Sequence, residues 1–478
     1  ASLIFLYESW KNGGITYPKH LIVWAALLLP AVYFLSALLS AASSLSLLGY
    51  NLESGTFVFI LLGSTVLLLS SIVFKDNSRV LQALAALLAA LSIIVLFGAI
   101  KIISGGNILV LGNFSGNTAN PLGNWTDLAI AAGLLSVLTI LSIGVIPMKN
   151  SIKAILYTVS ALSALLMFIL NFSGAFIITL VVSIPLYFYL SKIEKHFYPK
   201  GESKSTVSFP SQAAIILLVL SILSLAFLLN PTVSTSGKKL NTLVSGITNV
   251  SPSDVRPTLG ATLSVSKAVL SQVGLLGSGP NTFSHDWLIF KPININFTPF
   301  WGIAFPYGIA FIPTQIATTG ILGTALWILF FGLIVTLGFK VLNHIPDSRA
   351  QRFTLISSLV ITIFLWASSL LYTPSFTLLM LAFIFTGIFI AISQEVGIIS
   401  SKSINFKELP ATKAASIIII ILAGIGALYL GWVGVEKTIA SYHFKKASDL
   451  SAIPGTPINN VENQLEKAIK FSSQDIYY

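Results

Sequence analysis

Long apolar runs recur through almost the whole chain and limit the folds that it can adopt. A run of roughly 18 or more apolar residues is long enough to cross a bilayer as a helix. Helices satisfy their backbone polar groups internally, as hydrocarbon requires. Strands of a transmembrane barrel would alternate apolar and polar residues, and the run at 84–96 does not alternate. The apolar runs cover residues 20–46, 56–74, 80–103, 126–146, 152–171, 173–191, 211–230, 319–343, 353–372, 374–395 and 414–435.

The fold class that these runs predict is an all-α, polytopic transmembrane helix bundle with about 11 visible spans. Of the 478 residues, 55% are hydrophobic and 9% are charged, whereas a soluble domain carries about 25% charged residues. The chain has no cysteine, which excludes disulfides, thiolate metal sites and cysteine nucleophiles. Its net charge of +11 is spread over many loops and forms no basic stripe with interleaved aromatic residues, so we expect no nucleic-acid partner.

Lysine and arginine occupy every second loop between the runs. The connections between these basic loops, such as 104–125, almost lack both residues. Because basic loops stay in the cytoplasm, we expect the N-terminal segment 1–19 on the cytoplasmic side and the C-terminal tail on the outer side. The basic loops contain Lys75 and Arg79; Lys149 and Lys153; Lys192, Lys195, Lys200 and Lys204; Lys340, Arg349 and Arg352; and Lys402, Lys407 and Lys413.

One long hydrophilic segment, residues 231–300, separates a first transmembrane helix set (20–230) from a second (301–436). The alternation of basic loops places this segment on the outer face. It holds a large share of the few charged residues, so polar chemistry is expected there first. Two prolines interrupt the apolar stretch 301–319, which predicts a broken or re-entrant helix beside a cavity.

Both ends of the sequence carry expectations of their own. Residues 1–7 resemble the end of an apolar segment, so we expect one more span upstream. Residues 437–478 are polar and form a predicted extracytoplasmic tail, with helical spacing of apolar residues at 461–470. That helix is either the start of a repeat domain or a solvated tail.

Short motifs follow one another along the chain in a recognisable order. A Gly/Asn-rich segment at 116–121 leads into a span, and a pair of spans turns at 171–174. The hydrophilic segment has Arg256 ahead of an amphipathic stretch, then Gly-Leu-Leu-Gly-Ser-Gly-Pro-Asn-Thr-Phe at 274–283. The next span opens with Ala-Thr-Thr-Gly-Ile-Leu-Gly at 317–323. In this order of parts the chain resembles the O-antigen ligase and O-antigen polymerase family of polytopic membrane glycosyltransferases, which includes bacterial protein O-oligosaccharyltransferases.

The resemblance implies a transferase of cell-envelope polysaccharide biosynthesis in the prokaryotic cytoplasmic (inner) membrane. Such an enzyme moves a glycan from a polyprenyl diphosphate, such as undecaprenyl diphosphate, to a glycan, lipid or protein acceptor at the outer face. The resemblance implies no metal, no cofactor and no nucleotide sugar.

Two departures from the family pattern are visible. The family usually has a His-Asn pair about eleven residues before the glycine that matches Gly320, and here 307–312 offers only a tyrosine. Ser173-Gly174 stands where many members have Ser-Arg. A divergent enzyme, a member with relocated groups and a catalytically silent relative all fit these departures.

Arg256 is the main candidate for binding the diphosphate. Arginine makes planar, bidentate contacts with such an anion, and the start of the following helix would also favour it. The resemblance places an arginine here. The alternative is a solvated loop arginine paired with Asp254.

The acceptor hydroxyl needs a base, and we predict His285 with its neighbour Asp286 as the catalytic pair. A loop histidine is more often merely exposed. Asp127 and Glu53 could also supply a carboxylate on the outer side, but helix capping is the simpler account of both. The other predicted substrate-binding residues are Lys238, Lys239, Lys267, Trp287 and Tyr307. Each has a structural alternative, as a surface or interfacial lysine or as a residue of an interfacial aromatic belt.

Two other function classes stay open. One is a transporter or flippase of a lipid-linked saccharide, and the other is a non-catalytic membrane platform related to the ligases. Transporters usually bury ionisable residues at mid-membrane. Here Lys101 and Glu395 lie near span ends, which argues against ion-coupled transport. The missing His-Asn pair favours the platform.

Overall fold

The computed structural model divides into two units. The larger comprises Pro18–Leu47 and Ser54–Ser400, and the smaller comprises Ala1–Tyr17, Leu48–Glu53 and Ser401–Tyr478. The described residues are 14–49, 53–109, 116–197, 212–234, 237–250, 254–405, 410–455 and 457–471. The apolar segment at 1–7 and the loop residues Lys200, Lys204 and Lys407 lie outside them.

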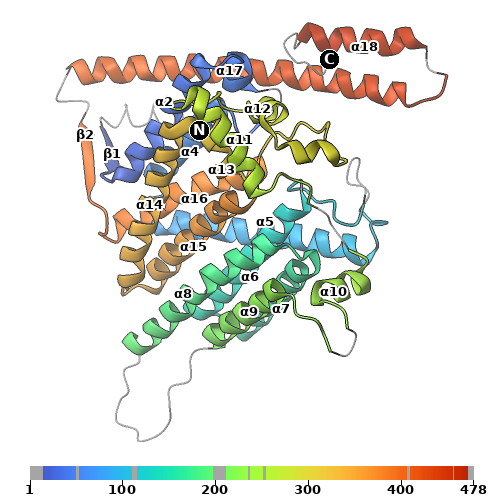
Figure 1. Cartoon of the computed structure of the whole chain (residues 1–478). Coiled ribbons are helices and arrows are strands. Elements are labelled where there is room, and N and C mark those ends of the chain that lie inside the picture. Colours follow the sequence, from blue (N-terminus) through green and yellow to red (C-terminus); the bar gives the residue numbers. More distant parts are fainter. Residues whose placement is uncertain are drawn as a thin grey trace, which may run out of the picture. The chain divides into compact units, whose positions relative to one another are not determined.

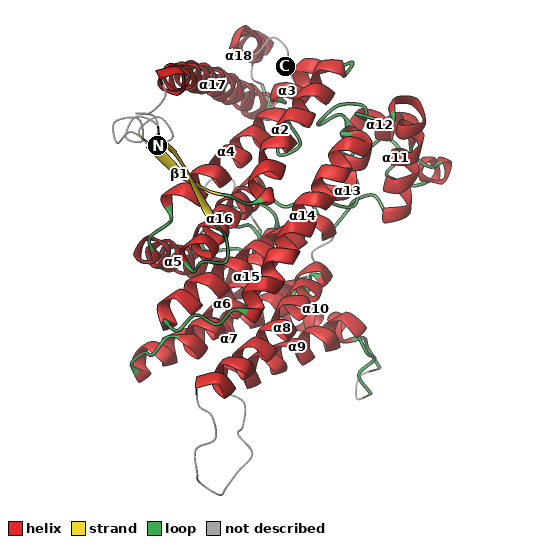
Figure 2. Ribbon diagram, turned by 90° about the vertical axis from the view of Figure 1, so that its left-hand side faces the viewer, coloured by secondary structure: helices red, strands yellow, loops and turns green. Residues whose placement is uncertain are grey.

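Helices dominate the described residues (Figure 2). Nine described helices are long and apolar enough to cross a membrane: α2 (Leu21–Leu39), α5 (Asn77–Ile103), α6 (Trp125–Val145), α7 (Asn150–Leu170), α8 (Ser173–Phe197), α9 (Gln212–Leu229), α14 (Gly320–Asn343), α15 (Arg349–Leu371) and α16 (Phe376–Glu395). Another apolar helix, α4 (Phe57–Val73), has 17 residues. The predicted polytopic helix bundle is thereby confirmed. The number of 11 spans stays a prediction, because the last run, 414–435, lies within the 42-residue helix α17 (Pro410–Ser451) of the smaller unit.

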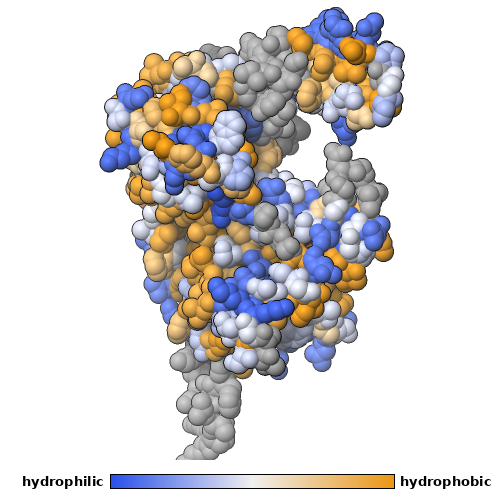
Figure 3. All heavy atoms as spheres, turned by 45° about the vertical axis from the view of Figure 1, so that its right-hand side comes forward, coloured by the Kyte–Doolittle hydropathy of each residue, from blue (hydrophilic) through white to orange (hydrophobic). Residues whose placement is uncertain are grey.

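Large apolar side chains lie on the outside of the long helices. Ile93, Phe188, Ile222 and Ile328, on four different helices, are each more than half exposed. Figure 3 shows hydrophobic residues gathered over the surface of the bundle. A protein surrounded by water rarely exposes so much apolar area, whereas a bilayer would cover it. The fold therefore indicates a multi-pass membrane protein.

Helix α6 forms the centre of one half of the larger unit. Of its most apolar stretch, 89% is buried, compared with 28% for its neighbour α7, so protein rather than lipid surrounds α6. It packs against α5, α7, α8, α9 and α15, and Figure 1 shows α6, α7, α8 and α9 side by side. A Cβ atom on Gly133 would lie 3.0 Å from Met167 Sδ and Thr179 Oγ1 and 3.1 Å from Phe364 Cζ. Gly133 thus lets α7, α8 and α15 approach α6 closely.

Gly133→Ala is expected to lower the melting temperature, because the added methyl group meets side chains from three helices at once. Overpacking of this kind costs about 1–3 kcal/mol. The matched control is Gly332→Ala in α14, where a Cβ atom has nothing within 4 Å. There the better helix propensity of alanine should leave the melting temperature unchanged or slightly higher. Thermal unfolding of both variants in detergent tests this contrast, and an equal response would contradict it.

A second group of helices completes the larger unit. Helix α4 packs against α2 and α16, and α2 packs against α14. Helix α2 ends at Leu39, earlier than the predicted run at 20–46, because Ser40 adopts an extended conformation. The short helix α3 (Ser43–Leu48) follows. At the contact of α4 with α16, Gly63 faces the ring of Phe383.

The hydrophilic segment and the stretch after it form four short helices and one 3-10 helix. They are α10 (Leu240–Thr248), α11 (Leu259–Val273), α12 (Phe283–Phe290), η1 (Ile293–Phe297) and α13 (Phe311–Thr318). Helix α13 lies within the stretch 301–319, for which the sequence predicts a broken or re-entrant helix. Thr319 separates it from α14, whose first residue, Gly320, has φ +65°. Helix α11 packs against α12, α13 and α14.

The two glycine motifs at 274–283 and 317–323 pack against each other. Ser278 N donates to Ala317 O at 3.1 Å, and Gly279 N donates to Thr318 O at 2.9 Å. A Cβ atom on Gly277, which has φ +70°, would collide with the backbone of 317–320. Directly after α2, the Ser40 hydroxyl donates to Ser278 O at 2.9 Å. The motifs therefore form one backbone joint between the end of α11 and the start of α14.

The smaller unit contains the strand β2 (Ser401–Asn405) and all but the last residue of β1 (Gly14–Pro18), and the two strands pair in a sheet. The sequence did not predict this short sheet. Helix α18 (Ile458–Phe471) covers the stretch 461–470 with helical spacing and packs against α17. His443 Nδ1 lies 2.8 Å from Gln464 Oε1, and its ring stacks on Phe471 at 6.4 Å.

Candidate functional site

Arg256 lies in the connection between α10 and α11 and joins three parts of the larger unit. Its Nη1 group donates to Ile309 O at 2.6 Å and to Leu371 O at 2.5 Å. Its Nε group forms an ion pair with Asp254 Oδ2 at 2.8 Å. The two side chains are 27% and 31% exposed, so solvent reaches both. The Nη2 group forms no hydrogen bond with the described residues.

The sequence explains why two carbonyl groups are available to Arg256. Helix α15 ends at Leu371 because Tyr372 is extended, with φ −156° and ψ −175°, and Pro374 follows. The last carbonyls of a helix have no partner within it, and a cation at this end is favoured. Ile309 is held in place by α11, since its N–H donates to Thr262 Oγ1 at 2.8 Å.

A buried carboxylate binds Tyr372, the residue after Leu371, whose carbonyl accepts from Arg256. Asp127 is 0% exposed, and its Oδ1 atom accepts hydrogen bonds from the Tyr372 hydroxyl at 2.6 Å and from Ser375 N at 3.2 Å. Its Oδ2 atom accepts from Asn124 N at 3.4 Å, at the start of α6. These donors offset the cost of burying the charge. The predicted capping role describes Asp127 well, and its full burial keeps it away from a substrate.

Aromatic rings connect Asp127 to Arg256. The Arg256 Cζ atom lies 6.0 Å from the centre of the Phe172 ring, in the turn between α7 and α8. The Phe172 ring meets Tyr372 at 5.2 Å and 72°. Burial and the Asp127 charge raise the pKa of Tyr372, so the hydroxyl stays protonated and remains a donor. We call Arg256, Asp254, Phe172, Tyr372 and Asp127 the Arg256 cluster.

Asp286 belongs to a different polar group. It is 3% exposed, and its Oδ2 atom accepts a hydrogen bond from the Ser278 hydroxyl at 2.6 Å. Ser278 Oγ also lies 2.8 Å from Thr282 Oγ1. Burial raises the pKa of Asp286, while the Ser278 hydrogen bond and the charge of His285 oppose the shift. The carboxylate thus holds the turn at 278–282 against the start of α12, whereas the side chain of His285 is exposed.

Asp286→Asn is expected to flatten the dependence of stability on pH. Because the folded-state pKa of Asp286 lies above its ordinary value of 3.8, the folded chain binds this proton more tightly than the unfolded chain. The resulting stability is present below pH 3.8 and is lost as pH rises through the folded pKa. Asparagine can still accept from Ser278 and does not titrate. The melting temperature should therefore fall less from pH 3.8 upward in the variant than in the parent, and parallel profiles would contradict this account.

The other predicted residues have separate surroundings. Trp287 is 1% exposed and packs in a small apolar cluster with Phe283 and α11, so its ring faces are not open to a sugar. Tyr307 is half-buried, and its hydroxyl lies 3.1 Å from Ser54 Oγ. Lys238, Lys239 and Lys267 are exposed, the first two beside α10 and the third on α11. Glu53 lies in the smaller unit.

Arg256 and the predicted base lie at opposite ends of α11. Arg256 precedes the helix and contacts Ile309, whereas Asp286 contacts Ser278 beyond its last residue. Helix α11 has 15 residues and is about 22 Å long. Within the described part of the chain, no hydrogen bond or ion pair joins Arg256 to His285 or Asp286. The carboxylate beside the guanidinium is Asp254, for which the sequence predicts only an ion pair with Arg256.

No group of three or more histidine and acidic side chains that could hold a metal ion occurs among the described residues. Comparison with models of protein families finds no match to this chain, and comparison with curated proteins finds none either. The likeness to the O-antigen ligases therefore rests on the motifs and their order, and it stays a prediction.

Proposed function

We propose that this protein transfers a glycan from a polyprenyl diphosphate to an acceptor at the outer face of the cytoplasmic membrane. The observation that carries the proposal is the Arg256–Asp254 pair, where a cation and a carboxylate lie 2.8 Å apart and both are partly exposed. Transfer to a hydroxyl needs a base for the acceptor proton and a cation for the leaving diphosphate, and this pair supplies one of each.

The Nη1 group of Arg256 binds backbone carbonyls, whereas its Nη2 group is left to bind a ligand. Nη1 is occupied by the carbonyls of Ile309 and Leu371, which fix the plane of the group. The two N–H bonds of Nη2 are left for the oxygens of a diphosphate. Charge-assisted bonds of this kind stabilise a leaving group whose charge grows in the transition state.

Asp254 would serve as the base in place of His285 and Asp286. In the transfer, the acceptor oxygen forms a bond to the anomeric carbon while the bond from that carbon to the phosphate oxygen breaks. The acceptor proton passes to the Asp254 carboxylate, and polyprenyl diphosphate leaves with the electron pair. Once Asp254 is protonated it no longer offsets the charge of Arg256, so the cation acts fully on the departing diphosphate at that moment.

The test uses the purified full chain in liposomes that contain a lipid-linked oligosaccharide and a soluble hydroxyl acceptor. Release of polyprenyl diphosphate together with the glycosylated acceptor is the expected result. Movement of the intact lipid-linked saccharide between leaflets, without bond cleavage, would favour the transporter instead. If the protein neither transfers the glycan nor moves the lipid-linked saccharide, the result would favour the non-catalytic platform.

Asp254→Asn is expected to lower transfer by about 10²- to 10⁴-fold, the usual contribution of a positioned base. The variant keeps an acceptor for the Arg256 Nε group and should therefore keep its melting temperature. His285→Gln is the comparison variant, since that side chain is exposed and distant from Arg256 along α11. If His285→Gln lowers the transfer rate more than Asp254→Asn does, His285 rather than Asp254 is the base.

A further inference from the structure

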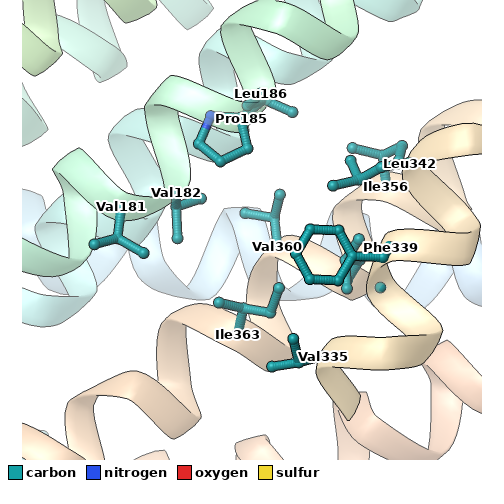
Figure 4. A pocket seen from close by; sticks show the side chains of 12 residues that line it. Val181, Val182, Pro185, Leu186, Val335, Phe339, Leu342, Ile356, Val360 and Ile363 are labelled. Atoms are coloured by element: carbon teal, nitrogen blue, oxygen red, sulfur yellow. The ribbon is translucent and has the colours of Figure 1, made fainter. Parts of the chain in front are cut away.

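An apolar crevice opens between α8, α14 and α15 in the larger unit. It encloses about 240 Å³, and every residue that lines it is apolar. Its floor is buried, with Leu186 and Leu359 each 2% exposed, whereas Val181 and Phe339 at its rim are 55% and 63% exposed. Figure 4 shows side chains from the three helices around this space. An apolar cavity of even about 150 Å³ stays dry and binds hydrocarbon.

The lining residues follow helical stripes on the two helices opposite α8. On α14 they recur at Val335, Gly338, Phe339 and Leu342, and on α15 at Ile356, Leu359, Val360 and Ile363. The spacing of i, i+3, i+4 and i+7 places each set on one face of its helix. The crevice is therefore elongated along the helices, and its shape suits a single hydrocarbon chain.

Polar side chains from all three helices gather at one end of the crevice. Arg352 lies one turn before Ile356 on the same face of α15 and is 5% exposed. On α8, which packs against α15, Tyr189 is 3% exposed and its hydroxyl has no hydrogen-bond partner among the described residues. Lys192 Nζ lies 3.5 Å from Asn343 Oδ1, next to the lining residue Leu342 of α14. This end thus offers two cations and a buried hydroxyl.

We propose that the crevice binds one acyl chain of an anionic membrane phospholipid. Lys192, Arg352 and the Tyr189 hydroxyl then hold its phosphate. The charge at this end complements a phosphate diester, and the apolar stripes complement the chain below it. Because the basic loops predict this end to be cytoplasmic, the lipid comes from the inner leaflet.

The site is separate from the one proposed for the polyprenyl diphosphate. Arg352 lies in the first turn of α15, and Leu371, which contacts Arg256, is its last residue. The helix has 23 residues and is about 34 Å long, close to the thickness of a bilayer core. The two polar ends therefore serve different leaflets, and the binding of the phospholipid does not depend on glycan transfer.

Native mass spectrometry of the purified full chain tests the proposal. Phosphatidylglycerol and phosphatidylcholine with identical acyl chains are added separately to the detergent-solubilised protein. The parent protein should retain phosphatidylglycerol preferentially, and Lys192→Gln should reduce that preference about fivefold, as expected for one basic residue near a phosphate. The control Lys149→Gln removes an exposed lysine before α7, a helix that does not line the crevice, and should keep the preference.

A second variant tests the apolar part. Val335 is 48% exposed at the rim, so Val335→Trp should fill the mouth of the crevice without disturbing the buried core. It should lower the retention of both lipids equally. Equal retention of the two lipids by the parent protein would overturn the proposal, as would an unchanged preference in Lys192→Gln. Displacement of phosphatidylglycerol by undecaprenyl phosphate in a manner that depends on Lys192 would overturn it too, since the crevice would then belong to the substrate lipid.

Discussion

Arg256→Lys should lower the rate of glycan transfer by about a hundredfold or more, because lysine cannot replace the fork of a guanidinium. A single ammonium group can reach either the carbonyls of Ile309 and Leu371 or the diphosphate, but not all of them. Loss of one preorganised donor to a developing charge typically costs about 10²–10³ in rate. The measurement is the initial rate of polyprenyl diphosphate release in liposomes.

The structural role of Arg256 calls for a control on folding. Arg256 connects the end of α15 to the segment before α13, so its replacement should also lower the melting temperature. Lys267→Gln is the matched variant, because it removes an exposed cation from α11. We expect unchanged rate and stability, which would also remove Lys267 from the predicted substrate-binding residues. A stable Arg256→Lys protein that keeps the parental rate would remove Arg256 from the substrate site. Equal losses of rate in both variants would mean that the overall positive charge of this region attracts the substrate, rather than a specific contact with Arg256.

Tyr372→Phe is expected to destabilise the fold by about 1.5–3 kcal/mol, the range for a hydrogen bond to a charged group. The variant removes the 2.6 Å donor to Asp127, whose carboxylate is fully buried and would keep only backbone donors. The phenyl ring preserves the packing on Phe172, so the loss reports on the hydrogen bond. Thermal unfolding in detergent measures the effect.

A double-mutant cycle separates the hydrogen bond from the packing around it. Asp127→Asn keeps an acceptor for Tyr372 and removes the buried charge. Tyr372→Phe should therefore cost less in the Asp127→Asn background than in the parent. Additive losses would mean that the two side chains do not act together. Transfer activity in each variant shows whether this part of the Arg256 cluster also positions Arg256.

Hydropathy predicted the helical bundle because the hydrocarbon core imposes one requirement on every span. The apolar run at 126–146 and helix α6 (Trp125–Val145) nearly coincide. Where a helix ends before its apolar run does, a local turn sets the boundary. Ser40 ends α2 seven residues before the end of the apolar run at 20–46, and hydropathy alone does not register that turn.

The candidate site could be predicted only in part, since its contacts join distant segments. The sequence identified Arg256, but not the carbonyls of Ile309 and Leu371 that hold it. Tyr372 and Asp127 are 245 residues apart, and no pattern in a single sequence pairs them. The sequence predicts His285 and Asp286 as the catalytic pair because a neighbouring carboxylate can tune a histidine as a base. Their neighbours in space proved to be the turn after α11 rather than Arg256.

The glycine motifs show how a sequence signature can report on architecture rather than chemistry. The motifs at 274–283 and 317–323 suggested a family of transferases, and in the fold they meet backbone to backbone. Gly277 and Gly320 both have positive φ and lie where a side chain would strike the opposite backbone. Their spacing is therefore explained by close packing, whatever reaction the protein carries out.

The same backbone joint affects how strongly the N-terminus of α14 can attract an anion. A helix that starts with free amide groups attracts anions, so such a start ordinarily binds phosphate well. Here Ile321 N and Leu322 N already donate to the carbonyls of Gly274 and Leu275, at 3.1 Å and 3.2 Å. Carbonyl groups from the residues directly after α11 thus occupy the first amide groups of α14 and oppose its attraction for an anion. A pyrophosphate that docks beside the start of α14 would therefore have to bind side-chain cations rather than these amide groups.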